Sequence, residues 1–138
     1  MTANAIAFIA TVILLFPMGY LFLASPAFLL VRLSIPQVTV LLRGMFSVYF
    51  LMMIVAGLLA TAAFAGTAHP LGALGMAAIT AFALAERRWF LGRMDRELHA
   101  RDSGDALAPR RLRLLHLGGM AVNAVLLALV AGSVPLIA

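Results

Sequence analysis

Four long apolar runs, separated by short links, are the feature that most constrains how this chain of 138 residues can fold. Crossing the hydrocarbon core of a bilayer takes about 20 mostly apolar residues, and 64% of this chain is hydrophobic. The runs use up most of the chain, so too little is left for a separate soluble domain. The sequence therefore predicts an all-α integral membrane protein with a single domain, residues 1–138.

The charged residues predict how the runs are oriented. All ten basic residues are arginines, and none lies between the second and third runs or near either end of the chain. Links rich in Lys and Arg face the cytoplasm in inner-membrane proteins. We therefore expect an antiparallel four-helix bundle in a bacterial inner membrane, with both termini in the periplasm. The arginines are Arg32 and Arg43 in the first link, and Arg87, Arg88, Arg93, Arg96, Arg101, Arg110, Arg111 and Arg113 in the third.

The proline, glycine and serine residues of the chain predict the helix boundaries. Pro17 lies inside the first run and should bend that helix, because its ring excludes a backbone hydrogen bond. Ser34 is expected to cap the second helix, with Pro36 in its first turn. The third helix should continue in polar form beyond the membrane and stop near Ser103-Gly104, as part of a cytoplasmic helical hairpin over residues 86–113. The predicted spans cover residues 4–24, 44–66, 71–90 and 112–136.

Small residues recur at every fourth position in three of the runs. Such stripes let helix backbones approach closely, so we expect them to lie inside the bundle. They are Gly57, Thr61 and Ala65; Ala73, Ala77, Ala81 and Ala85; and Ala124, Ala128 and Gly132.

Several classes of function are disfavoured. No predicted span has an acidic, basic or histidine residue in its central part, which argues against proton-coupled carriers and ion pumps. The chain has no cysteine, which excludes disulfides and thiolate chemistry. Asp95 and His99 share a charged helix face without a metal-binding motif, so no metal site is predicted. No catalytic residue is predicted, and the sequence favours a non-enzymatic protein.

Three groups of residues are candidates for binding. His116 and Asn123 share one face of the last helix; they suit a haem or quinone, or else His116 bonds a neighbouring helix. A group of arginines should bind anionic lipid phosphates or a protein partner: Arg87, Arg88, Arg110, Arg111 and Arg113. An intramembrane pocket is expected beside the kink of the first helix, lined by Pro17, Tyr20, Ser47 and Tyr49.

Three short motifs resemble the transmembrane protein 205-like family of small four-helix membrane proteins. The motifs are Ser25-Pro26-Ala27-Phe28, Met45-Phe46-Ser47-Val48-Tyr49, and Leu115-His116 with Asn123. The chain departs from the family pattern at Ser47, where a proline is usual, at Leu112, where an aromatic residue is usual, and at Gly119, where a serine is usual. The resemblance implies a four-span fold with no established enzymatic activity.

Together these features predict a non-enzymatic inner-membrane protein. It would be an accessory subunit of a larger membrane complex, or a binder of a hydrophobic small molecule or lipid. The expected partners are membrane lipids, anionic ones included, and other transmembrane subunits or further copies of the chain, but not nucleic acid. Two alternatives are a redox protein that holds haem or quinone near His116, and an oligomeric small-molecule transporter.

Overall fold

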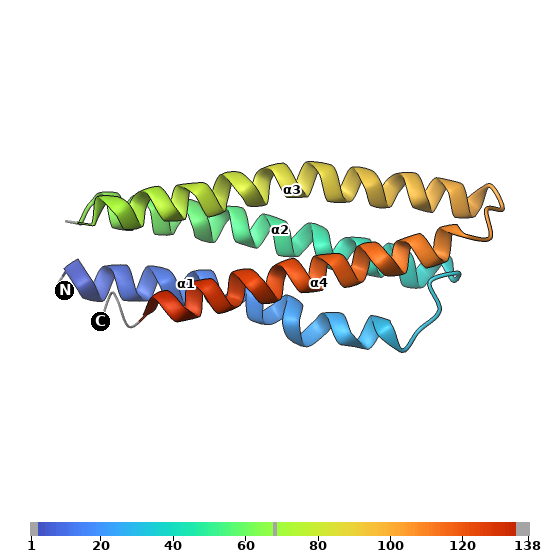
Figure 1. Cartoon of the computed structure of the whole chain (residues 1–138), viewed down its shortest axis with the longest axis horizontal. Coiled ribbons are helices and arrows are strands. Elements are labelled where there is room, and N and C mark those ends of the chain that lie inside the picture. Colours follow the sequence, from blue (N-terminus) through green and yellow to red (C-terminus); the bar gives the residue numbers. More distant parts are fainter. Residues whose placement is uncertain (1–2, 68, 135–138) are drawn as a thin grey trace.

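The computed structural model of the chain describes residues 3–67 and 69–134, and within them it is helical almost throughout. Four long helices run along one axis, alternating in direction (Figure 1). They are α1 (Ala3–Ala24), α2 (Pro36–Ala65), α3 (Pro70–Asp102) and α4 (Ala108–Ser133), and the short 3-10 helix η1 (Ser25–Leu29) directly follows α1. The predicted all-helical architecture is confirmed.

The helices differ in how well they suit a membrane. Three segments are long and apolar enough to cross one: Asn4–Leu29, α2 and α4. Helix α3 is longer, at 33 residues, but its second half carries most of the charged side chains of the whole chain. The described residues therefore contain three candidate spans and are compatible with a helical membrane bundle, and a fourth span in α3 stays a prediction.

The start of α2 differs from the expected one. Its first residue is Pro36, and the preceding Ile35 has an extended backbone, with φ −84° and ψ 119°. No side chain caps this end, so the prediction that Ser34 caps the helix is wrong. A proline at the first helical position has no N–H to satisfy and its φ already suits a helix, which makes a capping side chain less necessary.

The end of α3 lies where the sequence places it. Gly104 has a positive φ of 91°, a conformation that glycine adopts without steric cost. The Gly104 N–H donates to the Arg101 carbonyl at 2.9 Å, and the Asp105 N–H donates to the Ala100 carbonyl at 3.0 Å. This is the Schellman arrangement, which satisfies the last carbonyls of a helix and turns the chain back toward α4.

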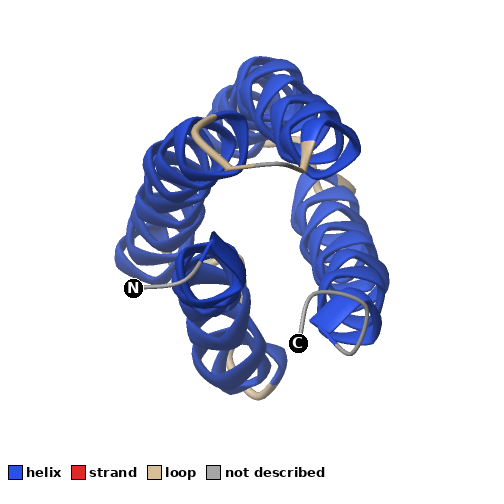
Figure 2. Ribbon diagram, turned by 90° about the vertical axis from the view of Figure 1, so that its left-hand side faces the viewer, coloured by secondary structure: helices blue, strands red, loops and turns tan. Residues whose placement is uncertain are grey.

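Seen along its axis, the molecule is a ring of four helices (Figure 2). Each helix packs against its neighbours in the chain, and α1 packs against α4 to complete the ring. Large side chains fill the centre, and the rings of Phe46 and Phe90 lie 4.5 Å apart there. Others that are fully buried are Phe50, Leu14, Met18, Leu42, Met53 and Met94.

The prediction that small-residue stripes line the interior is wrong for two of the helices. Ala81 and Ala85 of α3, and Ala124, Ala128 and Gly132 of α4, are exposed. In α2 the stripe is buried only at Gly57, where an added Cβ would overlap the Thr80 hydroxyl. A ring of four helices leaves a central space that must be filled to interior density, and Phe, Met and Leu side chains have the volume for it.

The two ends of the bundle differ in charge. The first turn of α1, the last turn of α4 and the α2–α3 turn lie at one end, and the other two links lie at the opposite end (Figure 1). The arginines all belong to the half of the molecule that approaches this second end, which we call the arginine-rich end.

Candidate functional site

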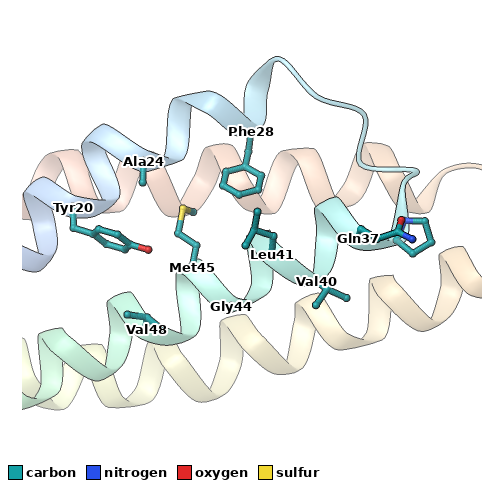
Figure 3. A pocket seen from close by; sticks show the side chains of 10 residues that line it. Tyr20, Ala24, Phe28, Gln37, Val40, Leu41, Gly44, Met45 and Val48 are labelled. Atoms are coloured by element: carbon teal, nitrogen blue, oxygen red, sulfur yellow. The ribbon is translucent and has the colours of Figure 1, made fainter.

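An apolar groove of about 820 Å³ opens between the α1–η1 segment and the first half of α2. Figure 3 shows Tyr20 and Phe28 pointing into it from α1 and η1, with Met45 and Leu41 pointing toward them from α2. Gly44 leaves space in the floor, because an added Cβ there would meet no atom within 4 Å. The full lining is Tyr20, Ala24, Phe28, Pro36, Gln37, Val40, Leu41, Gly44, Met45 and Val48.

The groove exists because the chain changes direction twice at this end. Ser25-Pro26 ends the regular α1 helix, and the chain continues as η1 up to Leu29. Residues 30–35 then lead back to α2. Since η1 is shorter and wound differently from α1, it does not continue the close packing of α1 on α2, and the two walls separate.

The four residues of the predicted intramembrane pocket do not line a single space in the structure. Tyr20 lines the groove, whereas Pro17 is buried in α1 and lines a separate depression of about 360 Å³. Tyr49 belongs to the core, with its ring 5.0 Å from that of Phe50. Ser47 lines neither of the two spaces. The prediction of one pocket lined by all four residues is therefore wrong, because Tyr49 is buried in the core whereas Tyr20 is exposed on the groove.

His116 is completely enclosed at the centre of the bundle. Its Nε2 lies 2.6 Å from the Ser25 hydroxyl, and the rings of Phe28 and Phe46 stand edge-on to the imidazole at 6.2 and 6.0 Å. The Nδ1 atom of the imidazole is buried without a hydrogen-bond partner among the described residues, so the surroundings of His116 leave the binding of a haem or quinone there a prediction. They match the alternative of a histidine that bonds a neighbouring helix.

Two further polar side chains on the same face of α4 bind α1, η1 and the link that follows η1. The Asn123 amide donates to the Met18 carbonyl at 3.0 Å. The Arg113 guanidinium donates to the Phe28 carbonyl and, at 2.5 Å, to the Val31 carbonyl. Together with the buried imidazole, these side chains form a polar seam that holds η1 against α4 and so supports one wall of the groove.

The arginines predicted to bind lipid or a partner differ in their hydrogen bonds, ion pairs and exposure. Arg111 is already paired, with Glu97 at 2.6 Å and Asp105 at 2.5 Å. Arg113 bonds backbone carbonyls only, among the residues that the structure describes. Arg87 buries its Nε without a partner in this part of the chain. Arg88 and Arg110 are exposed and make no ion pair within residues 3–67 and 69–134.

An ion pair that the sequence did not predict joins α2 to α3. Arg43 donates to Asp95 through two nitrogens, at 2.5 and 2.9 Å. These hydrogen bonds hold the pKa of Asp95 below its usual value. The pair spans two helices, so no local spacing reveals it; the available signal was a single arginine on an otherwise apolar helix, which needs a counter-charge.

Comparison with protein-family models, with curated proteins and with solved structures found no match for this chain. The resemblance suggested by the short motifs therefore stays a prediction, and a function for this chain has to be inferred from the geometry of its own residues.

Proposed function

We propose that this chain is a non-enzymatic membrane protein that binds an anionic amphiphile, with its apolar part in the α1–α2 groove. The observation that carries the proposal is the groove itself, which is lined mostly by apolar residues and lies toward the arginine-rich end (Figure 1). An acyl chain of a lipid has the shape and the polarity that such a groove accepts.

Charge around the groove favours a negative headgroup. Arg32 is exposed on the segment 30–35 that joins the two walls, and it has no carboxylate partner among the described residues. Arg113 supports the η1 wall through carbonyl bonds that leave its positive charge uncompensated. Basic groups at a membrane surface attract anionic headgroups by about 1 kcal/mol each. Tyr20 and Gln37 add polar groups to the apolar lining.

The proposal is tested by filling the groove. Gly44→Leu places an apolar side chain in the groove floor, where an added Cβ has no neighbour within 4 Å. Gly75→Leu makes the same change on the exposed face of α3, where an added Cβ is equally free. Both replace glycine by a better helix former, so both variants should fold.

Native mass spectrometry of the full chain, released from micelles containing phosphatidylglycerol or phosphatidylcholine, counts the lipid that stays bound. We expect phosphatidylglycerol to stay bound to the original chain and to Gly75→Leu, and its retention to fall about tenfold, or 1.4 kcal/mol, in Gly44→Leu. Equal retention in the two variants would contradict the groove as the site. Equal retention of the two lipids would contradict the preference for a negative headgroup. Recovery of the chain only within a larger complex that covers the groove would favour the accessory-subunit alternative.

A further inference from the structure

Glu86 differs from the other acidic residues of this chain in having no basic partner. Of the five acidic residues, four form ion pairs: Asp95 with Arg43, Glu97 with Arg93 and Arg111, Asp102 with Arg101, and Asp105 with Arg111. Glu86 makes no ion pair and no hydrogen bond through its carboxylate to any residue in the described ranges 3–67 and 69–134. It is half-buried, so its negative charge is partly removed from water and uncompensated, which is costly.

Glu86 lines a second groove, of about 600 Å³, between α3 and α4. Trp89 and Phe90 lie beside it on α3 and contribute aromatic surface. Gly118 of α4 keeps the opposite wall open, because an added Cβ there would meet no atom within 4 Å. The remaining lining residues are Arg93, Glu97, Arg111, Leu114, Leu115, Gly119 and Val122.

The arginines near this groove do not neutralise Glu86. Arg93 and Arg111 both pair with Glu97. Successive residues of an α-helix are turned by about 100°, so Arg87 and Arg88 point about 100° and 200° away from the groove face. Arg87 accordingly has its Nε buried, and Arg88 is exposed. The groove therefore combines an apolar and aromatic lining with one acidic side chain, Glu86, that has no ion-pair partner among the described residues.

We propose that the α3–α4 groove binds an amphiphilic organic cation, that is, a protonated amine or a quaternary ammonium or phosphonium group on an apolar body. The carboxylate of Glu86 would pair with the positive charge, and the exposed ring of Trp89 would add cation–π attraction. The apolar body would lie along Leu115 and Gly118. This site is separate from the α1–α2 groove and selects the opposite charge, so either proposal can fail without the other.

Binding of tetraphenylphosphonium and of tetraphenylborate to the full chain in dodecylmaltoside micelles tests the proposal. The two probes share size and shape and differ in the sign of their charge, and the micelle supplies no competing ammonium group. We expect the phosphonium to bind in the α3–α4 groove, whereas borate binding in the α1–α2 groove should fall in Gly44→Leu and should not fall in Glu86→Gln. Glu86→Gln should weaken phosphonium binding by tenfold or more, and Glu86→Asp, which keeps the carboxylate, should retain most of it.

A second variant keeps the test informative if the glutamine variant does not fold. Gly118→Leu fills the groove without changing a charge and should abolish phosphonium binding, whereas Gly75→Leu should leave it unchanged. Unaltered phosphonium binding in folded Glu86→Gln, or borate binding that falls together with phosphonium binding in this variant, would overturn the proposal. Because the chain has no cysteine, a Leu114→Cys variant tests by disulfide formation whether a second copy covers the groove. Efficient disulfide formation between two copies, with no phosphonium binding, would show that a second copy covers the groove and would also overturn the proposal.

Discussion

The Arg43–Asp95 pair shows how a single residue on one helix selects its neighbour on another. Two parallel N–H···O bonds fix both the distance and the rotation of α2 against α3 at the arginine-rich end. Both side chains are nevertheless substantially exposed, by 38% and 43%. Solvent screening therefore limits the contribution of the pair to stability to about 1 kcal/mol or less.

Replacing Asp95 by Asn should change the pH dependence of stability. The folded pKa of Asp95 is lowered, first by the hydrogen bonds from Arg43, so the unfolded chain binds this proton more readily than the folded one. The stabilisation is therefore present above about pH 4, the unfolded pKa, and is lost as the pH falls through the lowered folded value. Unfolding in detergent micelles between pH 6 and pH 3 should show a smaller pH-dependent loss in Asp95→Asn. Parallel curves for the two proteins would contradict this.

His116 illustrates what a sequence position can and cannot reveal. Its spacing from Asn123 correctly places both on one face of α4, and both are buried there. The partner of the imidazole is Ser25, which is 91 residues away in the chain. That contact depends on the break between α1 and η1, so a motif in α4 alone leaves both the ligand and the packing interpretations open.

The packing of α2 against α3 depends on one close approach between the two helices. Gly57 of α2 lies against Thr80 of α3, and an added Cβ would lie 3.2 Å from the Thr80 Cβ and overlap its hydroxyl. The Thr80 hydroxyl is held by the Met76 carbonyl at 2.8 Å, so moving it aside costs a hydrogen bond. A small residue is therefore required at this position of α2.

Gly57→Ala should destabilise the bundle by about 1–3 kcal/mol, because the added methyl forces α2 and α3 apart. Gly75→Ala receives the same gain in helix propensity at a site with no neighbour within 4 Å, and serves as the matched control. Adding Thr80→Ala to Gly57→Ala should recover most of the loss, since it removes the overlapping hydroxyl. The free energy of unfolding in mixed micelles measures all of these variants. A Gly57→Ala protein as stable as Gly75→Ala would contradict this account of the interface.

The element boundaries were more predictable than the element faces. Pro36, Gly66 and Gly104 lie at helix ends, because proline and glycine act directly on the backbone, although Pro17 lies inside α1. The buried face of α3 follows Met76, Thr80, Ala83 and Phe90 instead of the alanine stripe. Spacing identifies a helix face, but the width of the central space decides which face turns inward.

The distribution of charge between the two ends of the molecule predicts the orientation of the bundle in the membrane. The arginine-rich end contains the α3–α4 link, and the opposite end contains the α2–α3 turn (Figure 1). Basic links are retained on the cytoplasmic side. We therefore expect Ser103 on the cytoplasmic side and Thr67 on the periplasmic side.

Single-cysteine variants test this orientation without background, since the chain has no cysteine of its own. A membrane-impermeant maleimide added to intact cells, after the outer membrane is permeabilised, should label Thr67→Cys. It should label Ser103→Cys only once the inner membrane is opened. Ser103 is exposed and Thr67 is half-buried in its turn, so denatured samples provide the control for full labelling. The reverse pattern would overturn the predicted topology.

The amino-acid sequence by itself determined the helical content, the apolar character of three candidate spans and the stop of α3 at Gly104. These properties depend on hydrophobicity and backbone preferences, which each short segment carries on its own. The tertiary structure decided which side chains fill the core, that Arg43 meets Asp95, that His116 meets Ser25, and that Glu86 stays unpaired beside a groove. Such contacts depend on the relative rotation and spacing of helices distant in the chain, and these emerge only when all four helices pack together.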